Sequence, residues 1–78
     1  MHPPFQTLAD LLRHRLAVIA DHGWRDRDAA AHLAELQRVS EAISAEHKRL
    51  RPELPARLQH FLVQASYSKA LAWIEEGE

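Results

Sequence analysis

The chain has 78 residues, of which ten are Lys or Arg and eleven are Asp or Glu, and it contains no cysteine. This length permits one domain with one core, and the lack of cysteine excludes disulfides, thiolate metal sites and a cysteine nucleophile. The formal net charge of −1 lacks the positive field expected of a nucleic-acid-binding protein. We therefore expect a single helical domain over residues 1–78.

The sequence gives no sign of membrane insertion or export. Its N-terminus, MHPPFQTLADLLRHRL, has no basic leader followed by an uninterrupted apolar run. No stretch approaches the roughly 18 consecutive apolar residues of a membrane-spanning helix. Together with the absence of cysteine, which is compatible with a reducing compartment, this predicts a soluble cytoplasmic protein with no membrane partner.

The first predicted helix covers residues 8–22 and follows an extended tail over residues 1–6. Thr7 is a suitable N-cap, and Gly23 suits the left-handed position that ends many helices. Apolar residues recur through this segment at helical spacing, namely Leu8, Leu11, Leu12, Leu16 and Ile19.

The second predicted helix is the longest and covers residues 27–50. Asp26 or Asp28 can act as its N-cap. One apolar stripe runs along it, formed by Ala30, Leu33, Leu36, Val39, Ile43 and Leu50. Pro52 and Pro55 then interrupt the chain, because proline disfavours helix in the residue before it and is tolerated in a first turn.

A third helix is predicted over residues 54–75, beginning between the two prolines. No segment alternates apolar and polar residues as a strand would. Since both connections are short, the predicted fold is all-α, an antiparallel up-down-up three-helix bundle.

The third helix is apolar on two opposite sides. At about 100° per residue, one side gathers the expected core residues Leu58, Phe61, Leu62, Ala65 and Ala72. A second stripe lies roughly 170° away by the same rotation and contains Val63, Tyr67, Ala70 and Ile74. Leu71 and Trp73 widen this apolar arc. A helix docked on two neighbours does not bury both sides, so the second stripe needs an explanation.

Two explanations remain open. Either the bundle surrounds the third helix, with Tyr67 lying flat on a loop, or a partner outside the chain covers the second stripe. We favour a partner, because small domains without disulfides often gain stability by oligomerising. A homodimer that pairs this helix with its symmetry mate is the simplest arrangement, and another protein is the other candidate partner. The predicted interface consists of Val63, Tyr67, Ala70, Leu71, Trp73 and Ile74.

The histidines form no recognisable catalytic or metal-binding motif. No two of His14, His22, His32, His47 and His60 are three or four residues apart, as a helix-borne metal pair would be. His22 and His47 lie near apolar stripes and are interpreted as structural. With only two glycines, the chain has no phosphate-binding loop and no dinucleotide fingerprint. We predict no enzymatic activity, no metal, no cofactor and no small-molecule substrate.

Nucleic-acid binding is the alternative function, since a three-helix bundle can be a helix-turn-helix domain. A basic cluster of Lys48, Arg49, Arg51 and Arg57 could contact phosphates. The polar side chains of the third helix, however, are spread around its circumference and are not presented together to base edges. The sequence therefore predicts a small non-enzymatic protein–protein interaction module that self-associates through its third helix.

Overall fold

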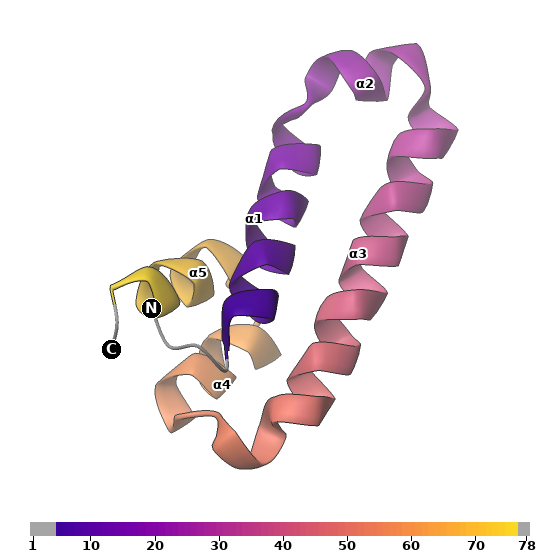
Figure 1. Cartoon of the computed structure of the whole chain (residues 1–78). Helices are drawn as coiled ribbons and strands as arrows, with labels where there is room; N and C mark the ends of the chain where they lie inside the picture. Colours follow the sequence, from indigo (N-terminus) through magenta and orange to yellow (C-terminus); the bar gives the residue numbers. More distant parts are fainter. Residues whose placement is uncertain (1–4, 77–78) are drawn as a thin grey trace.

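A computed structural model of the chain describes residues 5–76, which are all-helical and contain no strand (Figure 1). The predicted all-α class is confirmed. The helices are α1 (Gln6–Ala20), α2 (His22–Arg27), α3 (Ala29–Leu50), the short 3₁₀ helix η2 (Arg51–Glu53), α4 (Ala56–Val63) and α5 (Tyr67–Glu75). The up-down-up bundle of three helices is not confirmed, because the described residues form five α-helices.

The long helices α1 and α3 run antiparallel and form a hairpin that the short helix α2 closes (Figure 1). The prediction that Gly23 ends the first helix is wrong. Helix α1 ends at Ala20, and Gly23 lies inside α2. The Asp21 side chain caps α2 instead, accepting a hydrogen bond from the backbone N–H of Trp24 over 3.0 Å.

The bounds of α3 agree closely with the sequence prediction. Asp28, one of the two predicted caps, accepts a hydrogen bond from the backbone N–H of Ala31 over 3.1 Å. The helix then continues through residues of high helical propensity, chiefly Ala, Glu, Leu and Arg, and ends at Leu50. Helix α4 begins at Ala56, directly after Pro55, whose extended backbone forms the N-cap of α4.

The start of the chain differs from the predicted tail over residues 1–6. Residues 1–4, which include the two prolines of that tail, lie outside the described residues. Phe5 is buried in the core, and α1 already begins at Gln6. Thr7 therefore lies within the first turn and does not cap the helix. Burial of the Phe5 ring explains the earlier start, because it fixes the chain against the core.

The third predicted helix is two helices separated by a turn at Ala65. Its φ angle is 57°, in the left-handed region. The N–H of Ala65 donates to the carbonyl of Leu62 over 3.1 Å, and the N–H of Ser66 donates to that of Phe61 over 2.8 Å. These two hydrogen bonds define a Schellman motif, which ends α4 and turns the chain into α5.

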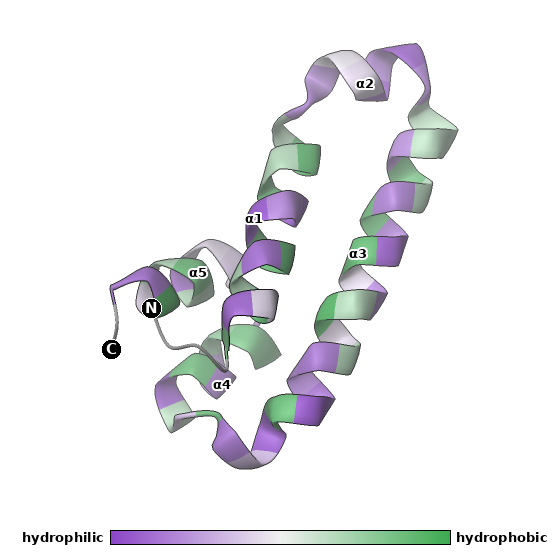
Figure 2. Ribbon diagram, viewed as in Figure 1, coloured by the Kyte–Doolittle hydropathy of each residue, from purple (hydrophilic) through white to green (hydrophobic). Residues whose placement is uncertain are grey.

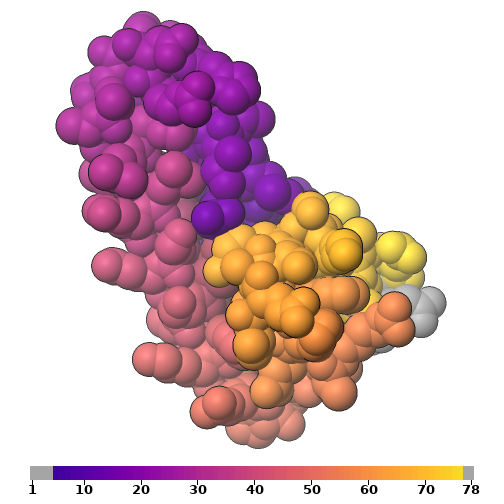
Figure 3. Space-filling model, turned by 180° about the vertical axis from the view of Figure 1, so that it is seen from behind, coloured from indigo at the N-terminus to yellow at the C-terminus, as the bar shows by residue number. Residues whose placement is uncertain are grey.

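The hydrophobic core lies where α4 and α5 pack against the hairpin. It contains Phe5, Leu8, Ala9, Leu12, Val39, Ile43, Leu50, Leu58, Leu62, Ala70, Leu71 and Ile74. Seen from behind, α4 and α5 cover only one end of the hairpin (Figure 3). At the end near α2, the two long helices form a single uncovered layer. The molecule is accordingly elongated, with extents of 39 × 22 × 21 Å.

Candidate interaction surfaces

The structure does not arrange the six predicted interface residues as one exposed stripe. Ala70 and Ile74 are completely buried and Leu71 is nearly so, all within the chain's own core. Tyr67 and Trp73 are partly buried against that core. Only Val63, with 68% of its surface exposed, is freely accessible. The expectation that these residues form a second exposed face of one helix is therefore corrected.

The turn at Ala65 is the physical reason for this difference. A helical wheel relates residues before and after a position only if the helix is continuous. Because α5 starts anew after the turn, Ala70 and Ile74 point towards α1 and the core. The same break makes the predicted core face only half right, since Leu58 and Leu62 are buried whereas Ala65 and Ala72 are exposed.

The two broad faces of the hairpin differ in character, and two neighbouring residues of α1 mark them. His14 Nε2 lies 2.6 Å from a carboxylate oxygen of Glu35, while Arg15 Nε donates to the Ser40 hydroxyl over 3.3 Å. Successive helical residues point about 100° apart, so these contacts lie on opposite sides of the α1–α3 interface. We call them the Glu35 side and the Ser40 side.

The Glu35 side is polar and carries ion pairs. Arg38 donates from Nε and Nη2 to the two carboxylate oxygens of Glu35, each over 2.7 Å. The pKa of Glu35 is lowered from 4.5 to about 2, chiefly by this bidentate contact with Arg38 and secondly by the hydrogen bond with His14. About three turns further along α3, Arg49 forms the same paired contact with Glu46 and lowers the pKa of that carboxyl.

Acid is expected to weaken the fold through this side. Since the pKa of Glu35 is lower in the folded chain, its ion pairs stabilise the fold above pH 4.5, and this contribution is lost as the pH falls towards 2. The thermal midpoint of Glu35→Gln should therefore fall less over this pH range than that of the wild type. Circular dichroism at a series of pH values measures this. Glu41→Gln, an exposed position on the same helix outside these ion pairs, is the control. Parallel curves for the wild type and Glu35→Gln would contradict the expectation.

The Ser40 side of the hairpin is apolar near α2. Leu36 and Leu33 lie four and seven residues before Ser40, and Ile19 lies four residues after Arg15, so all three share this side. Leu33 is 55% and Ile19 is 41% exposed, and Leu36 is partly buried. We call Ile19, Leu33 and Leu36 the hairpin patch. Both long helices carry hydrophobic residues beyond the part that α4 and α5 cover (Figure 2).

Helix α5 begins at the edge of the hairpin patch. The guanidinium carbon of Arg15 lies 4.7 Å from the centre of the Tyr67 ring, where it makes a cation–π contact. Tyr67 is the first residue of α5, which crosses α1 and runs out to the side away from α3 (Figure 1). The patch is thus the uncovered continuation of the face that α4 and α5 bury elsewhere (Figure 3).

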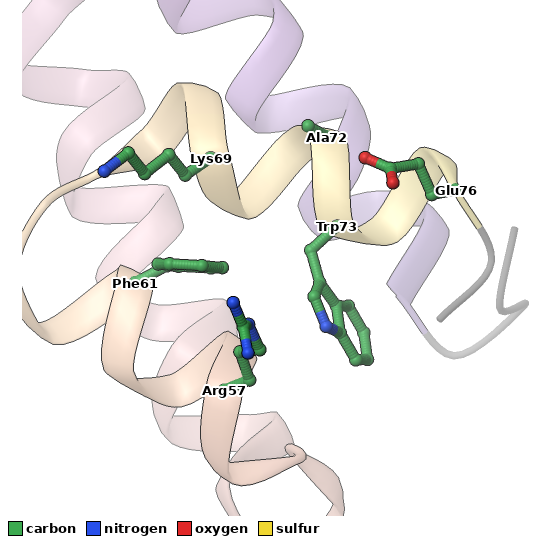
Figure 4. A pocket seen from close by; sticks show the side chains of 6 residues that line it. All are labelled: Arg57, Phe61, Lys69, Ala72, Trp73 and Glu76. Atoms are coloured by element: carbon green, nitrogen blue, oxygen red, sulfur yellow. The ribbon is translucent and has the colours of Figure 1, made fainter.

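A second candidate surface is a groove of about 420 Å³ between α4 and α5. Its lining consists of Arg57, Phe61, Lys69, Ala72, Trp73 and Glu76. Arg57 and Phe61 from α4 face Trp73 from α5 across the groove (Figure 4). Phe61 and Trp73 are partly buried, whereas the three charged residues of the lining, Arg57, Lys69 and Glu76, are exposed.

Sequence reasoning placed Phe61 in the core and Arg57 in a basic cluster, and so missed the groove. A signal was present, because Arg57 precedes Phe61 by four residues and Lys69 precedes Trp73 by four. Residues four apart share one face of a helix, so each short helix contributes one cation and one aromatic ring to the lining of the groove. The basic cluster itself is divided, since Arg49 is paired with Glu46 while Lys48 and Arg51 line a pocket where α3 meets η2.

The buried histidine serves the fold. His32 is 5% exposed and donates from Nε2 to the carbonyl of Val18 over 2.7 Å, which ties α3 to the end of α1. Trp24 packs edge-on against its ring at 5.6 Å and so fixes α2. His22 is exposed at the start of α2, and His47 has a buried Nε2 without a hydrogen-bond partner among the described residues. Within residues 5–76, no three His, Asp or Glu side chains gather as a metal site would require.

Comparisons with known proteins provide no family. No protein-family model matches the sequence, and neither a curated protein nor a solved structure is significantly similar to it. No helix in the described part of the chain has the length and hydrophobicity needed to cross a membrane.

Proposed function

We propose that the protein is a small non-enzymatic interaction module that pairs with a second copy of itself through the hairpin patch. The observation that carries this proposal is the exposure of Leu33 and Ile19 on the part of the hairpin where α1 and α3 form a single layer that no other helix covers. A single layer of two helices can bury the apolar residues of one face only against a second layer. A further layer of helices on that face therefore stabilises it.

The chemistry of the patch favours a second copy as the partner. Two hairpins that meet face to face form a four-helix bundle, and one patch serves both sides of such a symmetric contact. Arg15, the cation next to the patch, is already engaged by Ser40 and the Tyr67 ring. Pairing of two copies therefore brings their apolar side chains together, and it does not place an unpartnered Arg15 of one copy against that of the other. The Glu35 side, by contrast, carries the ion pairs and remains in solvent.

Light scattering coupled to size exclusion, over a wide concentration range, tests the proposal. The wild type should form dimers. Leu33→Glu should weaken dimerisation more than 100-fold and yield a folded monomer, because an uncompensated charge in the contact costs about 3 kcal/mol or more. Circular dichroism verifies the fold of the variant.

Val63→Glu is the matched control, because Val63 is more exposed than Leu33 and lies at the end of α4, outside the patch. It should dimerise as the wild type does. A wild type that remains monomeric at every concentration would exclude self-association. Dissociation by Val63→Glu and not by Leu33→Glu would move the contact to the end of α4.

A further inference from the structure

We infer that the groove between α4 and α5 binds a peptide segment that carries an acidic residue next to an aromatic or aliphatic anchor. This site is separate from the hairpin patch, since it lies on the outer side of the two short helices (Figure 4). Its volume of about 420 Å³ is sufficient for one or two side chains and their backbone.

The walls of the groove provide the place for the anchor. Phe61 and Trp73 line it from opposite helices, and both rings are partly buried against the core, which holds them in position. The Arg57 side chain lies between the two rings, and Ala72 lines the groove from α5 above Trp73 (Figure 4). Aromatic rings that the core holds in position can receive an apolar side chain with little loss of conformational entropy on binding.

The rim of the groove provides the place for the acid. Arg57 and Lys69 are exposed there, and neither forms an ion pair with a carboxylate among the described residues. The Arg57 guanidinium carbon lies 5.9 Å from the centre of the Phe61 ring, so the cation is held beside the anchor position. An acidic side chain next to an apolar one matches this arrangement of cation and ring.

Glu76 at the end of the groove decides between a peptide and a nucleic acid. Its carboxylate lines the same groove as the two cations, at the end opposite Lys69 (Figure 4). A phosphate chain carries only negative charge and is repelled by this group. A peptide has carboxylates for Arg57 and Lys69, and also backbone N–H donors that a carboxylate accepts. The mixed charge of the rim is therefore complementary to a peptide.

Nuclear magnetic resonance on the full chain tests the inference. The probe is a short peptide of alternating Asp and Phe with blocked ends, titrated into the ¹⁵N-labelled protein. The two tryptophans provide internal reporters, because Trp73 lines the groove and Trp24 lies on α2 beside His32. The indole N–H signal of Trp73 should shift in a saturable way, and that of Trp24 should not move. A Trp24→Phe variant assigns the two signals.

Charge variants then locate the acid contact. Arg57→Gln and Lys69→Gln should each weaken peptide binding about tenfold, as loss of a charge-assisted hydrogen bond does. Arg25→Gln on α2 and Lys48→Gln on α3 make the same changes of charge at exposed positions outside the groove, and they should leave the affinity unchanged. A peptide with Asn in place of Asp should bind the wild type about tenfold more weakly.

Three results would overturn the inference. The first is the absence of any Trp73 shift at millimolar peptide. The second is an equal loss of affinity in the groove variants and their controls, since binding would then follow overall charge. The third is tighter binding of a single-stranded oligonucleotide than of the peptide, with the same Trp73 signal shifted, which would assign the groove to nucleic acid.

Discussion

Ile74→Ala is expected to lower the free energy of unfolding by about 2–4 kcal/mol, because it leaves a cavity in a fully buried site. A domain of this size is stabilised by only roughly 4–12 kcal/mol, so the loss is a large fraction of the total. The thermal midpoint should fall by about 10 °C or more. Urea and thermal unfolding, followed by circular dichroism at one fixed protein concentration, measure both quantities.

Val63→Ala is the control for this prediction. Helical periodicity in the sequence places Val63 and Ile74 on one stripe, yet the structure leaves Val63 68% exposed and buries Ile74 completely. Val63→Ala should therefore change the stability by less than about 0.5 kcal/mol. Equally small effects of the two substitutions would mean that Ile74 is not buried and that the continuous helix is correct.

Ala65→Gly is expected to stabilise the fold, although glycine normally weakens a helix. Ala65 holds the left-handed position of the Schellman motif, where a β-carbon costs roughly 1–2 kcal/mol. Glycine removes this strain, and its greater freedom in the unfolded chain offsets roughly 0.4–1 kcal/mol of the gain. The net increase of about 0.5–1 kcal/mol should raise the thermal midpoint by a few degrees.

Two companion variants fix the interpretation. Ala45→Gly, at an exposed position in the middle of α3, should lose about 1 kcal/mol, as glycine in a regular helix does. Ala65→Val should also lose stability, because a β-branched residue strongly resists a positive φ. If Ala65→Gly were destabilising to the same extent as Ala45→Gly, the chain would be helical through Ala65 and the motif would not exist.

The hairpin could be predicted well from the sequence because its signals are local. Asp28 caps α3 through its own side chain, and Pro55 keeps the preceding Leu54 extended, which separates α4 from the end of α3. The periodicity of the leucines in both long helices gave their extent to within about two residues. Such features depend on a few neighbouring residues and not on the tertiary structure.

The turn between α4 and α5 could not be predicted, because its sequence argues against it. Alanine is the strongest helix former and is rarely found in the left-handed position, which usually holds glycine. The turn is instead imposed by packing, since it lets Ala70, Leu71 and Ile74 join Leu58 and Leu62 in one core. Burying these side chains outweighs roughly 1–2 kcal/mol of backbone strain.

The hairpin patch was hidden from sequence reasoning by the same turn. The apolar stripes of the first two predicted helices include Ile19, Leu33 and Leu36. A third helix as long as the predicted one would have covered these residues. Helix α3 has 22 residues and is about 33 Å long, whereas α5 has nine residues and spans about 14 Å. The two short helices cover only part of the hairpin, and the rest of the predicted core becomes surface.

The packing of α5 on α1 imposes an order of events during synthesis on the ribosome. The hairpin can form once residues 6–50 have emerged, because its contacts lie within that segment. Arg13 of α1, however, can contact its partner Glu75, at 3.1 Å, only after α5 has been made. The buried Ala9 lies one turn before Arg13 on the same side of α1. Before α5 has been translated, Ala9 therefore lacks the cover that it has in the folded chain, and apolar surface exposed in this way favours misassembly.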